Sequence, residues 1–338
     1  LSLWSIEGTP SGGGRVEASL HYQDIISLEN LLEAWKEFIK GKRRKRDVQE
    51  FQLNLMDNIL ELHRDLRSLR YVHGGYRHFR INDPKPRDIH KAKVRDRLLH
   101  HAIYKILYPF FDKTFISDSF SCRNEKGTHR ALNRFRSFGY KVSRNHTRTC
   151  WILKCDIRKF FENINHGILL GILKRHIQDK DIISLLEKVI RSFSSRPDTG
   201  LPLGNLTSQL LVNIYMNEFD RFIKHRLKIK HYIRYADDFV ILSENKSWLE
   251  KQIEPIRNFL SNNLKLELHS DKIYIRTLAS GLDLLGWVHF LDHRVLRTAT
   301  KRRMFRRLRE SPNPETIGSY LGLLRWGNTN KLKKNIKL

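Results

Sequence analysis

Hydrophobic residues recur at helical spacing through the first part of the chain. Positions three or four apart lie on the same side of a helix, so this spacing predicts helices within residues 20–70. One predicted apolar face contains Leu28, Leu31, Leu32 and Trp35. A second predicted face contains Leu53, Met56, Ile59, Leu60 and His63.

Residues 71–150 mix strand and turn signals. Gly74-Gly75 and Asp83-Pro84 mark turns around a short predicted strand at 76–81, because glycine and proline interrupt regular structure. A helix is predicted from about 95 to 107. Pro109 is expected to end it, since proline cannot donate the helical hydrogen bond.

Strand and helix patterns alternate in residues 151–290. The predicted order is a strand at 151–157, helices at 169–193 and 205–227, two strands around a tight turn at 232–242, a helix at 248–260, and strands at 264–268 and 272–277. This order predicts an α+β fold compatible with a ferredoxin-like unit. Residues 291–338 are basic and predicted to be helical, and 1–19 are expected to form a flexible leader.

The excess of positive charge indicates that this α+β protein has an anionic partner. The chain has 63 Lys and Arg against 36 Asp and Glu, a net charge of +27. Six basic residues lie within 40–46, and a second cluster contains Lys301, Arg302, Arg303, Arg306, Arg307 and Arg309. Such clusters can neutralise phosphates, which favours nucleic acid as the partner. A basic surface that only maintains solubility is the alternative.

The remaining composition points to a folded protein of a reducing compartment. Three cysteines without metal-ligand spacing, and no signal-peptide pattern, predict a cytoplasmic chain. No apolar run reaches the roughly 18 residues of a membrane span, so no membrane partner is expected.

Candidate chemistry appears where two aspartates interrupt an apolar run. Asp237 and Asp238 lie in the middle of 232–242, whose other residues favour strands. Two adjacent carboxylates repel each other unless a cation lies between them, and Mg²⁺ prefers hard oxygen ligands. The pair therefore predicts a metal site at a hairpin tip. An ordinary Asp-Asp surface turn is the alternative.

A third carboxylate follows the apolar strand at 151–157. Asp156, with Ile157 after it, could complete a site for two metal ions. In such a site one ion activates an attacking 3′-hydroxyl and the other stabilises the leaving pyrophosphate. The alternative for Asp156 alone is a helix N-cap.

These segments carry a family resemblance. Residues 235–238, Tyr-Ala-Asp-Asp, resemble the catalytic box of reverse transcriptases, and 153–161 resemble their first palm motif. Further matches, in the same order, are 85–87 with 96–97, 119–123 with 127–131, Lys272, and 285–287. The resemblance covers 76–326. It implies a right-hand polymerase with N-terminal helices and fingers in 20–150, a palm in 151–290 (165–200 partly fingers) and a small thumb in 291–338.

The resemblance also assigns roles. Asp156, Asp237 and Asp238 would be catalytic and would hold two Mg²⁺ ions, with Mn²⁺ as a possible substitute and the Ile157 carbonyl assisting. Phe161 would be an aromatic gate that excludes the ribose 2′-hydroxyl. Its alternative is a core phenylalanine, a role for which Phe160 is the better candidate.

Nucleotide contacts follow in the same way. Arg87, Lys93 and Arg97 would bind the incoming triphosphate, since guanidinium groups suit phosphate, unless they form only a solvated basic face. Lys272 would protonate or neutralise the pyrophosphate, or is simply a strand-edge lysine. Predicted contacts to nucleic acid are Arg123, Tyr235, Lys301, Arg302, Arg303, Arg306 and Arg307.

One motif narrows the resemblance within the family. Residues 203–209 begin with Leu203 and Gly204 and end with a serine followed by Gln209. Many reverse transcriptases instead carry glutamine at the Leu203 position. This version, together with 319–326, is similar to the enzymes of diversity-generating retroelements, bacterial relatives of group II intron and retron enzymes. A leucine cannot make the glutamine's hydrogen bond, which would loosen discrimination between nucleotides. Aliphatic residues at this position also fit other bacterial lineages.

The predicted function is RNA-directed DNA synthesis from deoxynucleoside triphosphates. The diversity-generating type implies cDNA with errors at template adenines, used for targeted gene diversification. It also implies a template RNA, an RNA/DNA duplex and a small basic accessory protein as partners. A defence-associated or retron-like reverse transcriptase is one alternative, and a non-catalytic RNA-binding scaffold is another.

Overall fold

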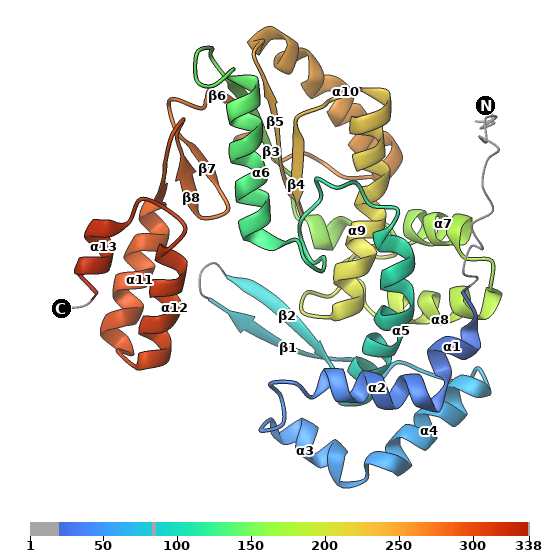
Figure 1. The fold of residues 1–338 in the computed structure, drawn as a ribbon. Helices are drawn as coiled ribbons and strands as arrows, with labels where there is room; N and C mark the ends of the chain where they lie inside the picture. The colour runs from blue at the N-terminus through green and yellow to red at the C-terminus, as the bar shows by residue number, and fades with distance from the viewer. Residues whose placement is uncertain (1–19, 83–85, 337–338) are drawn as a thin grey trace, which may run out of the picture.

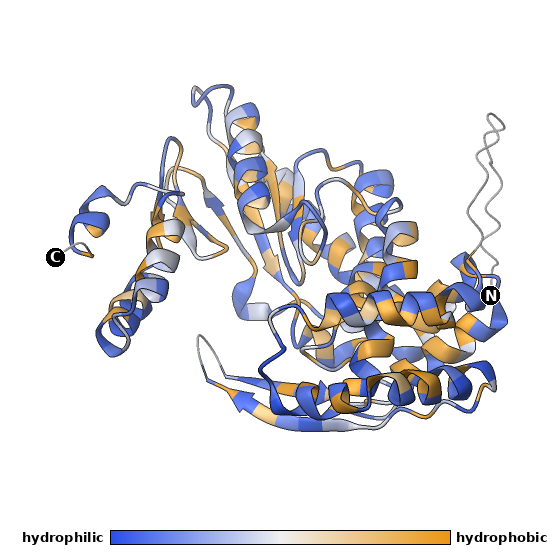
Figure 2. Ribbon diagram, turned by 60° about the horizontal axis from the view of Figure 1, so that its bottom comes forward, coloured by the Kyte–Doolittle hydropathy of each residue, from blue (hydrophilic) through white to orange (hydrophobic). Residues whose placement is uncertain are grey.

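The computed structural model describes residues 20–82 and 86–336. The predicted leader at 1–19 and the predicted turn at Asp83-Pro84 lie wholly or partly outside the described residues. The chain begins with four helices, as the apolar spacing predicts: α1 (Tyr22–Ile26), α2 (Leu28–Phe38), α3 (Arg46–Leu53) and α4 (Leu55–Arg67). Each shows hydrophobic and hydrophilic residues in its ribbon (Figure 2).

The second predicted apolar face is wrong. Leu53 is 83% exposed and Met56 is 50% exposed, whereas α4 buries a face made of Ile59, Leu62 and Leu66. The physical reason is a break at Asn54, whose non-helical backbone separates α3 from α4 and resets the helical phase. Residues counted as one face therefore belong to two helices.

A two-stranded hairpin follows, formed by β1 (Tyr76–Ile81) and β2 (Arg87–Ala92). It extends away from the helices (Figure 1). The next helix, α5 (Val94–Asp112), continues through Pro109 instead of ending before it. Its last turn buries Tyr108 and Phe111, and this burial offsets the hydrogen bond that the proline removes.

The central sheet has four antiparallel strands in the order β4-β5-β3-β6. They are β3 (Trp151–Asp156), β4 (Tyr232–Tyr235), β5 (Asp238–Ser243) and β6 (Tyr274–Thr277). Helices separate β3 from β4, a tight turn joins β4 to β5, and a helix separates β5 from β6. This is the predicted ferredoxin-like order of elements.

Side chains on the sheet alternate between two cores. Leu153, Phe239 and Ile241 face the large core shared with α9 (Leu206–Arg221) and α10 (Lys246–Leu264). Ile152 and Val240 face a second core shared with α6 (Gly127–Val142). Because successive residues of a strand point to opposite faces, both sides of the sheet are covered by helices.

Three boundaries in this region differ from the prediction. The single helix expected at 169–193 is two helices, α7 (His166–His176) and α8 (Lys180–Arg191), because Asp179 caps the start of α8 with its side chain. The helix expected at 205–227 ends in a π-helical turn, Phe222–Arg226. Residues 264–268 form no strand, only one isolated bridge to Ile157.

The C-terminal lobe is the segment from β7 to α13. It contains a small sheet of β7 (Leu282–Leu284), β8 (Trp287–His289) and β9 (Arg294–Leu296), then α11 (Thr298–Glu310), α12 (Pro314–Leu324) and α13 (Asn330–Lys334). The prediction of a wholly helical segment from 291 is wrong at β9. Trp287, Met304 and Leu324 form a small core that includes Leu132 of α6.

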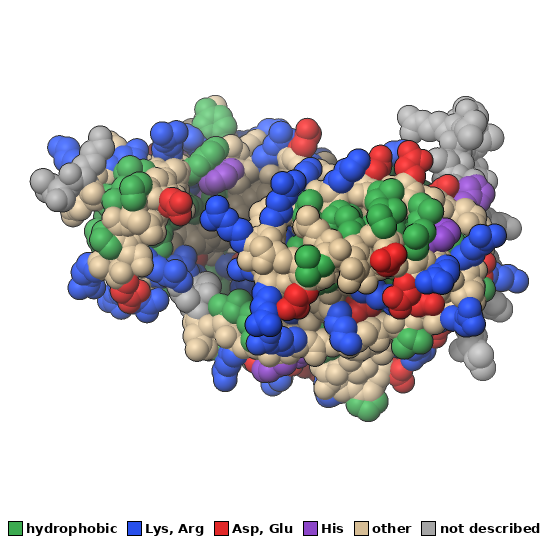
Figure 3. All heavy atoms as spheres, turned by 90° about the horizontal axis from the view of Figure 1, so that it is seen from below, with side chains coloured by type: hydrophobic (Ala, Val, Ile, Leu, Met, Phe, Trp, Pro, Cys, Tyr) green, Lys and Arg blue, Asp and Glu red, His purple; other side chains and the backbone are tan. Residues whose placement is uncertain are grey.

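A hollow separates the C-terminal lobe from the rest of the molecule, and Lys and Arg side chains lie around it (Figure 3). Among the described residues, no helix is both long and apolar enough to cross a membrane.

Candidate active site

Three aspartates meet at one end of the central sheet. Asp156 is the last residue of β3 and pairs in register with Asp238, the first residue of β5. Asp237 lies in the turn between β4 and β5, where Ala236 adopts a left-handed backbone with φ 57°. The Ile157 amide donates to the Asp237 carbonyl at 3.2 Å. The two predicted acidic segments, about 80 residues apart in sequence, are therefore adjacent.

Burial raises the pKa of two of these carboxyl groups, those of Asp237 and Asp238. Burial raises the pKa of Asp238 to about 6, and the neighbouring carboxylates of Asp237 and Asp156 add to the increase. The pKa of Asp237 is also raised, mainly by burial and then by Asp156. Oδ1 of Asp238 is buried without a hydrogen-bond partner. Such an oxygen is costly unless a cation or donor reaches it.

Two lysines contact the aspartates. Lys272, in the 3₁₀ turn Ser270–Lys272, donates from Nζ to Oδ1 of Asp156 at 2.9 Å. Lys154 of β3 lies 3.2 Å from Oδ2 of Asp238 and donates to the Asp283 carbonyl at 2.7 Å. As the side chains lie, the described residues contain no group of three or more His, Cys, Asp and Glu arranged to hold a metal ion. The oxygen donors and the unpartnered Asp238 Oδ1 nevertheless fit a hard divalent cation.

A buried ion pair supports the turn. Arg234 of β4 and Asp220 of α9 are bonded twice, Nε to Oδ1 at 2.8 Å and Nη2 to Oδ2 at 2.7 Å. Arg234 also donates from Nη1 to the Ala236 carbonyl at 3.1 Å. Sequence reasoning missed this pair, although an arginine inside an apolar strand was a usable signal. It fixes the backbone that presents Asp237 and Asp238.

The family follows from a comparison with protein-family models. The model described as "Reverse transcriptase (RNA-dependent DNA polymerase)" matches residues 82–315, more than half of the chain. This chain belongs to the reverse transcriptase family. Its fold is the right-hand polymerase fold, in which the antiparallel central sheet is the palm sheet.

Several curated proteins are similar to this reverse transcriptase. "Protein YkfC" of Escherichia coli (strain K12) is 27% identical over 246 residues, 62% of this chain and 62% of that protein. "Group II intron-encoded protein LtrA" of Lactococcus lactis subsp. cremoris is 25% identical over 293 residues, 66% of this chain. The chain spans only 47% of LtrA's length.

A solved structure also resembles the chain. It is apo telomerase from Candida tropicalis truncated from its C-terminal domain, at 12% identity and a TM-score of 0.48. The likeness covers 72% of this chain and 60% of that chain, and it is too weak to support a conclusion of its own.

The two phenylalanines after the first palm motif differ in burial. Phe160 is 3% exposed and belongs to the large core, the role considered for it from the sequence. Phe161 is only partly buried, and its carbonyl accepts from the Leu201 amide at 2.8 Å. This bond ties the start of the 3₁₀ turn Phe160–Asn163 to the loop that carries Leu203.

The three residues predicted to bind the triphosphate have different surroundings. Arg87 is exposed at the start of β2, and its positive charge lowers the pKa of Asp237 against the larger effect of burial. Lys93 is exposed just before α5. Arg97 is paired with Asp47 and lies over the ring of Phe38. Of these three residues, only Arg87 contributes to the pKa shift of Asp237.

The Leu203-Gly204 segment is anchored to the fingers hairpin. The His90 amide donates to the Leu203 carbonyl at 3.2 Å, and the Asn205 side chain donates to the His90 carbonyl at 3.0 Å. Gly204 has φ 103°, a conformation that other residues rarely adopt. Gly204, Gln209 and Arg97 line one cavity of about 410 Å³ between the hairpin and α9.

Two predicted nucleic-acid contacts have protein partners. Arg123 donates to Asp112 at 2.7 Å and to the Ile116 and Ser119 carbonyls, and its side chain is 5% exposed. Because the donors of Arg123 are already used inside the protein, the structure argues against the predicted contact of Arg123 with nucleic acid. The hydroxyl of Tyr235 lies 3.1 Å from that of Thr128 on α6.

The predicted thumb contacts all lie on α11. Lys301, Arg302, Arg306 and Arg307 are exposed, and Arg303 is partly buried. Arg306 is 3.8 Å from Glu310 on the same helix. Because α11 buries little beyond Thr300 and Met304, most of its surface is basic and open to solvent.

Proposed function

We propose that this chain is an RNA-directed DNA polymerase that makes cDNA from a template RNA and deoxynucleoside triphosphates. The observation that carries the proposal is the pairing of Asp156 with Asp238 across the palm sheet, with Asp237 in the adjoining turn. Carboxylates arranged on rigid strands are what a phosphoryl-transfer site needs, since the protein mainly positions reactants and neutralises charge.

Members of this family normally use divalent metal ions, and Mg²⁺ is the ion proposed here. Asp156, Asp237, Asp238 and the Ile157 carbonyl would hold two such ions, which supply an activated 3′-hydroxyl and a stabilised leaving group. Lys154 and Lys272 meanwhile balance the buried negative charge of the carboxylates. Lys272 releases Asp156 in this proposal and is then free to neutralise pyrophosphate.

Substrate selection would fall to residues beside the aspartates. The positive charge of Arg87 lowers the pKa of Asp237, which supports a role for Arg87 in binding the triphosphate. Phe161 sits on a fixed turn and would exclude a ribose 2′-hydroxyl by its volume. Template RNA and the RNA/DNA duplex would lie along the basic hollow, with α11 on the phosphates.

Primer extension on an RNA template tests the proposal. Wild-type chain is expected to extend a DNA primer with dNTPs when Mg²⁺ is present and to stop when EDTA removes it. Mn²⁺ is expected to substitute. Extension that continues in EDTA would remove the metal mechanism. No extension with any divalent ion, while RNA still binds, would favour the RNA-binding scaffold instead.

A finer proposal concerns the type of reverse transcriptase. We infer that Leu203 loosens base selection, as in diversity-generating retroelements, with a small basic accessory protein as an additional partner. The anchoring of the loop supports this inference. The Leu203 backbone is hydrogen-bonded to β2, so a substitution at Leu203 changes the side chain without moving the loop. A leucine there offers no hydrogen bond to fix the nucleotide.

Sequencing the cDNA decides between the types. Wild type is expected to misincorporate opposite template adenines, and Leu203→Gln to reduce those errors about tenfold. Leu227→Gln, the same chemical change far from the loop, is the control and should leave the spectrum unchanged. Faithful cDNA from the wild type would favour a defence-associated or retron-like enzyme.

A further inference from the structure

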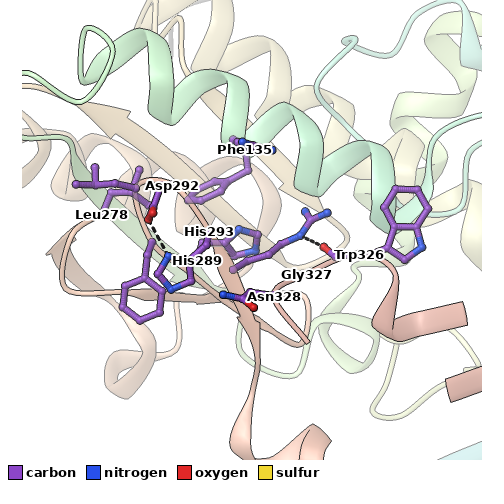
Figure 4. Close-up of a pocket in the computed structure, with 12 residues that line it drawn as sticks. Phe135, Leu278, His289, Asp292, His293, Trp326, Gly327 and Asn328 are labelled. Atoms are coloured by element: carbon purple, nitrogen blue, oxygen red, sulfur yellow. Dashed lines mark hydrogen bonds and ion pairs between the residues drawn. The ribbon is translucent and has the colours of Figure 1, made fainter. Parts of the chain in front are cut away.

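A cavity of about 220 Å³ lies between the palm and the thumb, apart from the three aspartates. Its walls come from α6, the segment after β6, the β8-β9 hairpin and the loop after α12, represented by Phe135, Leu278, His289 and Trp326 (Figure 4). Sites for drug-sized ligands are about 300–1,000 Å³, so this cavity suits a smaller group of one or two rings.

Two polar side chains in this cavity have atoms without partners. His289 and Arg294 pair in register across the β8-β9 hairpin, which places their side chains on the same face of the small sheet. His289 is 3% exposed, and its Nε2 has no hydrogen-bond partner. Nη1 of Arg294 is also buried and unpartnered. Buried polar atoms are normally satisfied, so the pair indicates a missing ligand.

The two atoms offer complementary chemistry. Burial lowers the pKa of His289 to about 4, so the ring is neutral near pH 7. The backbone of Leu284 hydrogen-bonds the ring, which leaves Nε2 as an acceptor, while Arg294 Nη1 is a donor. A ligand must therefore present a donor next to an acceptor, the pattern found on the edges of nucleobases.

Aromatic rings and positive charge complete the site. Phe135 packs edge-on against His289 with ring centroids 4.9 Å apart, and Phe290 also lines the cavity. Arg136 of α6 and Arg294 both line it, and the charge of Arg136 contributes to lowering the pKa of Arg294. Among the described residues neither arginine has an acidic partner. Asp292 at the rim is held by His293 at 2.7 Å. Two guanidinium groups without an acidic partner fit a phosphate.

The C-terminal loop closes one side of the cavity. Trp326 stacks on His129 of α6 with ring centroids 3.8 Å apart, and its carbonyl accepts from Nε of Arg294. These contacts hold the Arg294 side chain in place. The bond to Trp326 uses Nε and leaves Nη1 without a partner.

We propose that this cavity binds a nucleobase, with the attached phosphate at Arg136 and Arg294. The base is either that of a free nucleotide or one extruded from an RNA strand bound in the adjacent hollow. Single-stranded RNA is commonly recognised in this way, with splayed bases placed against aromatic rings and hydrogen-bonded along their edges. The site would hold the strand without taking part in polymerisation.

Equilibrium binding to the full chain in EDTA tests the site, because the metal-dependent step is then excluded. One arm titrates the four ribonucleoside 5′-monophosphates, and the other a short single-stranded RNA of mixed sequence. His289→Leu removes the acceptor and preserves most of the volume. Because the variant also removes the ring's hydrogen bond to the Leu284 backbone, a thermal melt checks that it remains folded. Arg136→Gln is the second variant, and Arg130→Gln, on another face of α6, is its control.

The expected result is an affinity about tenfold weaker for His289→Leu, and weaker for Arg136→Gln than for Arg130→Gln. A loss confined to RNA would identify an extruded base, and a loss for monophosphates would identify a free nucleotide. Equal affinities of wild type and His289→Leu in both arms would overturn the proposal. Neither arm requires primer extension, so this outcome is independent of the proposed polymerase activity.

Discussion

Arg234 and Asp220 form a two-bond ion pair next to the turn that carries Asp237, with side chains only 1% and 0% exposed. Tyr232 adds a third hydrogen bond to Asp220 at 2.7 Å. An ion pair this deeply buried holds its partners in one geometry, since either charge alone would be costly in the interior. The position of Asp237 and Asp238 therefore depends on a charge pair outside the active site itself.

Removing one member of this pair should destabilise the protein strongly. Arg234→Met is expected to lower the free energy of unfolding by about 3–5 kcal/mol, because Asp220 would remain buried and unpaired. Urea denaturation followed by circular dichroism measures the change. The double variant Arg234→Met with Asp220→Leu should be more stable than Arg234→Met alone. A double variant that loses the sum of both single effects would show that the two residues act independently.

Asp237→Ala should lower the rate of cDNA synthesis by a factor of at least about 10³, while RNA binding persists. The reason is that Asp237 lies in the turn and contributes a carboxylate, whereas the basic surfaces proposed to bind RNA are elsewhere. Primer extension and a filter-binding assay measure the two properties separately. Asp271→Ala, at an exposed site near Lys272, is the control and should retain activity. Full activity of Asp237→Ala would rule out the proposed metal site.

Mild acid should destabilise the fingers through buried histidines. Burial lowers the pKa of His100 to about 3, with further contributions from His73, His101 and Arg97. The folded state keeps this ring neutral while the unfolded chain protonates near its usual pKa of about 6.5. Stability is therefore fully present above about pH 6.5 and decreases as the pH falls toward 3.

His100→Leu should reduce this acid sensitivity. Urea midpoints at pH 7 and pH 5 should differ less for His100→Leu than for wild type, since the unpartnered ring is gone. His146→Leu, at an exposed position, is the control and should follow wild type. An identical pH dependence of His100→Leu and wild type would contradict the prediction.

The exposed basic residues of α11 should contribute to salt-dependent binding. Replacing Lys301 and Arg302 with glutamine removes two exposed charges. The slope of log affinity for an RNA/DNA duplex against log salt should fall by about 1.5, because fewer counterions are released. Lys180→Gln with Lys251→Gln, on α8 and α10, is the matched control and should keep the wild-type slope. Equal slopes for both pairs of variants would place the duplex away from α11.

The sequence predicted the four strands of the central sheet and the position of the three aspartates beside them because these signals are local. Each aspartate adjoins an apolar strand, and the period of two along a strand is readable without tertiary information. The same holds for α2, whose apolar stripe lies within a single helix. Where a helix breaks, as at Asn54, counting positions through the break assigns residues such as Leu53 to the wrong side.

Other features depend on contacts that no local pattern encodes. Strands β7, β8 and β9 have three residues each, too short for a periodic signal. In the sequence Arg123 does not differ from an exposed arginine, and only the folded position of Asp112 shows that its donors are used internally. Arg234 and Asp220 lie 14 residues apart, and their pairing requires α9 to return against β4.

Helix α6 packs into two hydrophobic cores at once. Leu132 belongs to the small core of the C-terminal lobe, whereas Phe135, one turn later, belongs to the core beneath the palm sheet. Thr128, on the same helix, contacts Tyr235 next to the catalytic turn. If a duplex binds in the hollow as proposed, displacing the lobe would disturb the contact at Leu132 and also the core that Leu282 and Leu284 of β7 share with Phe135. Through Thr128 and Tyr235, such a displacement would reach the strand that precedes the turn with Asp237.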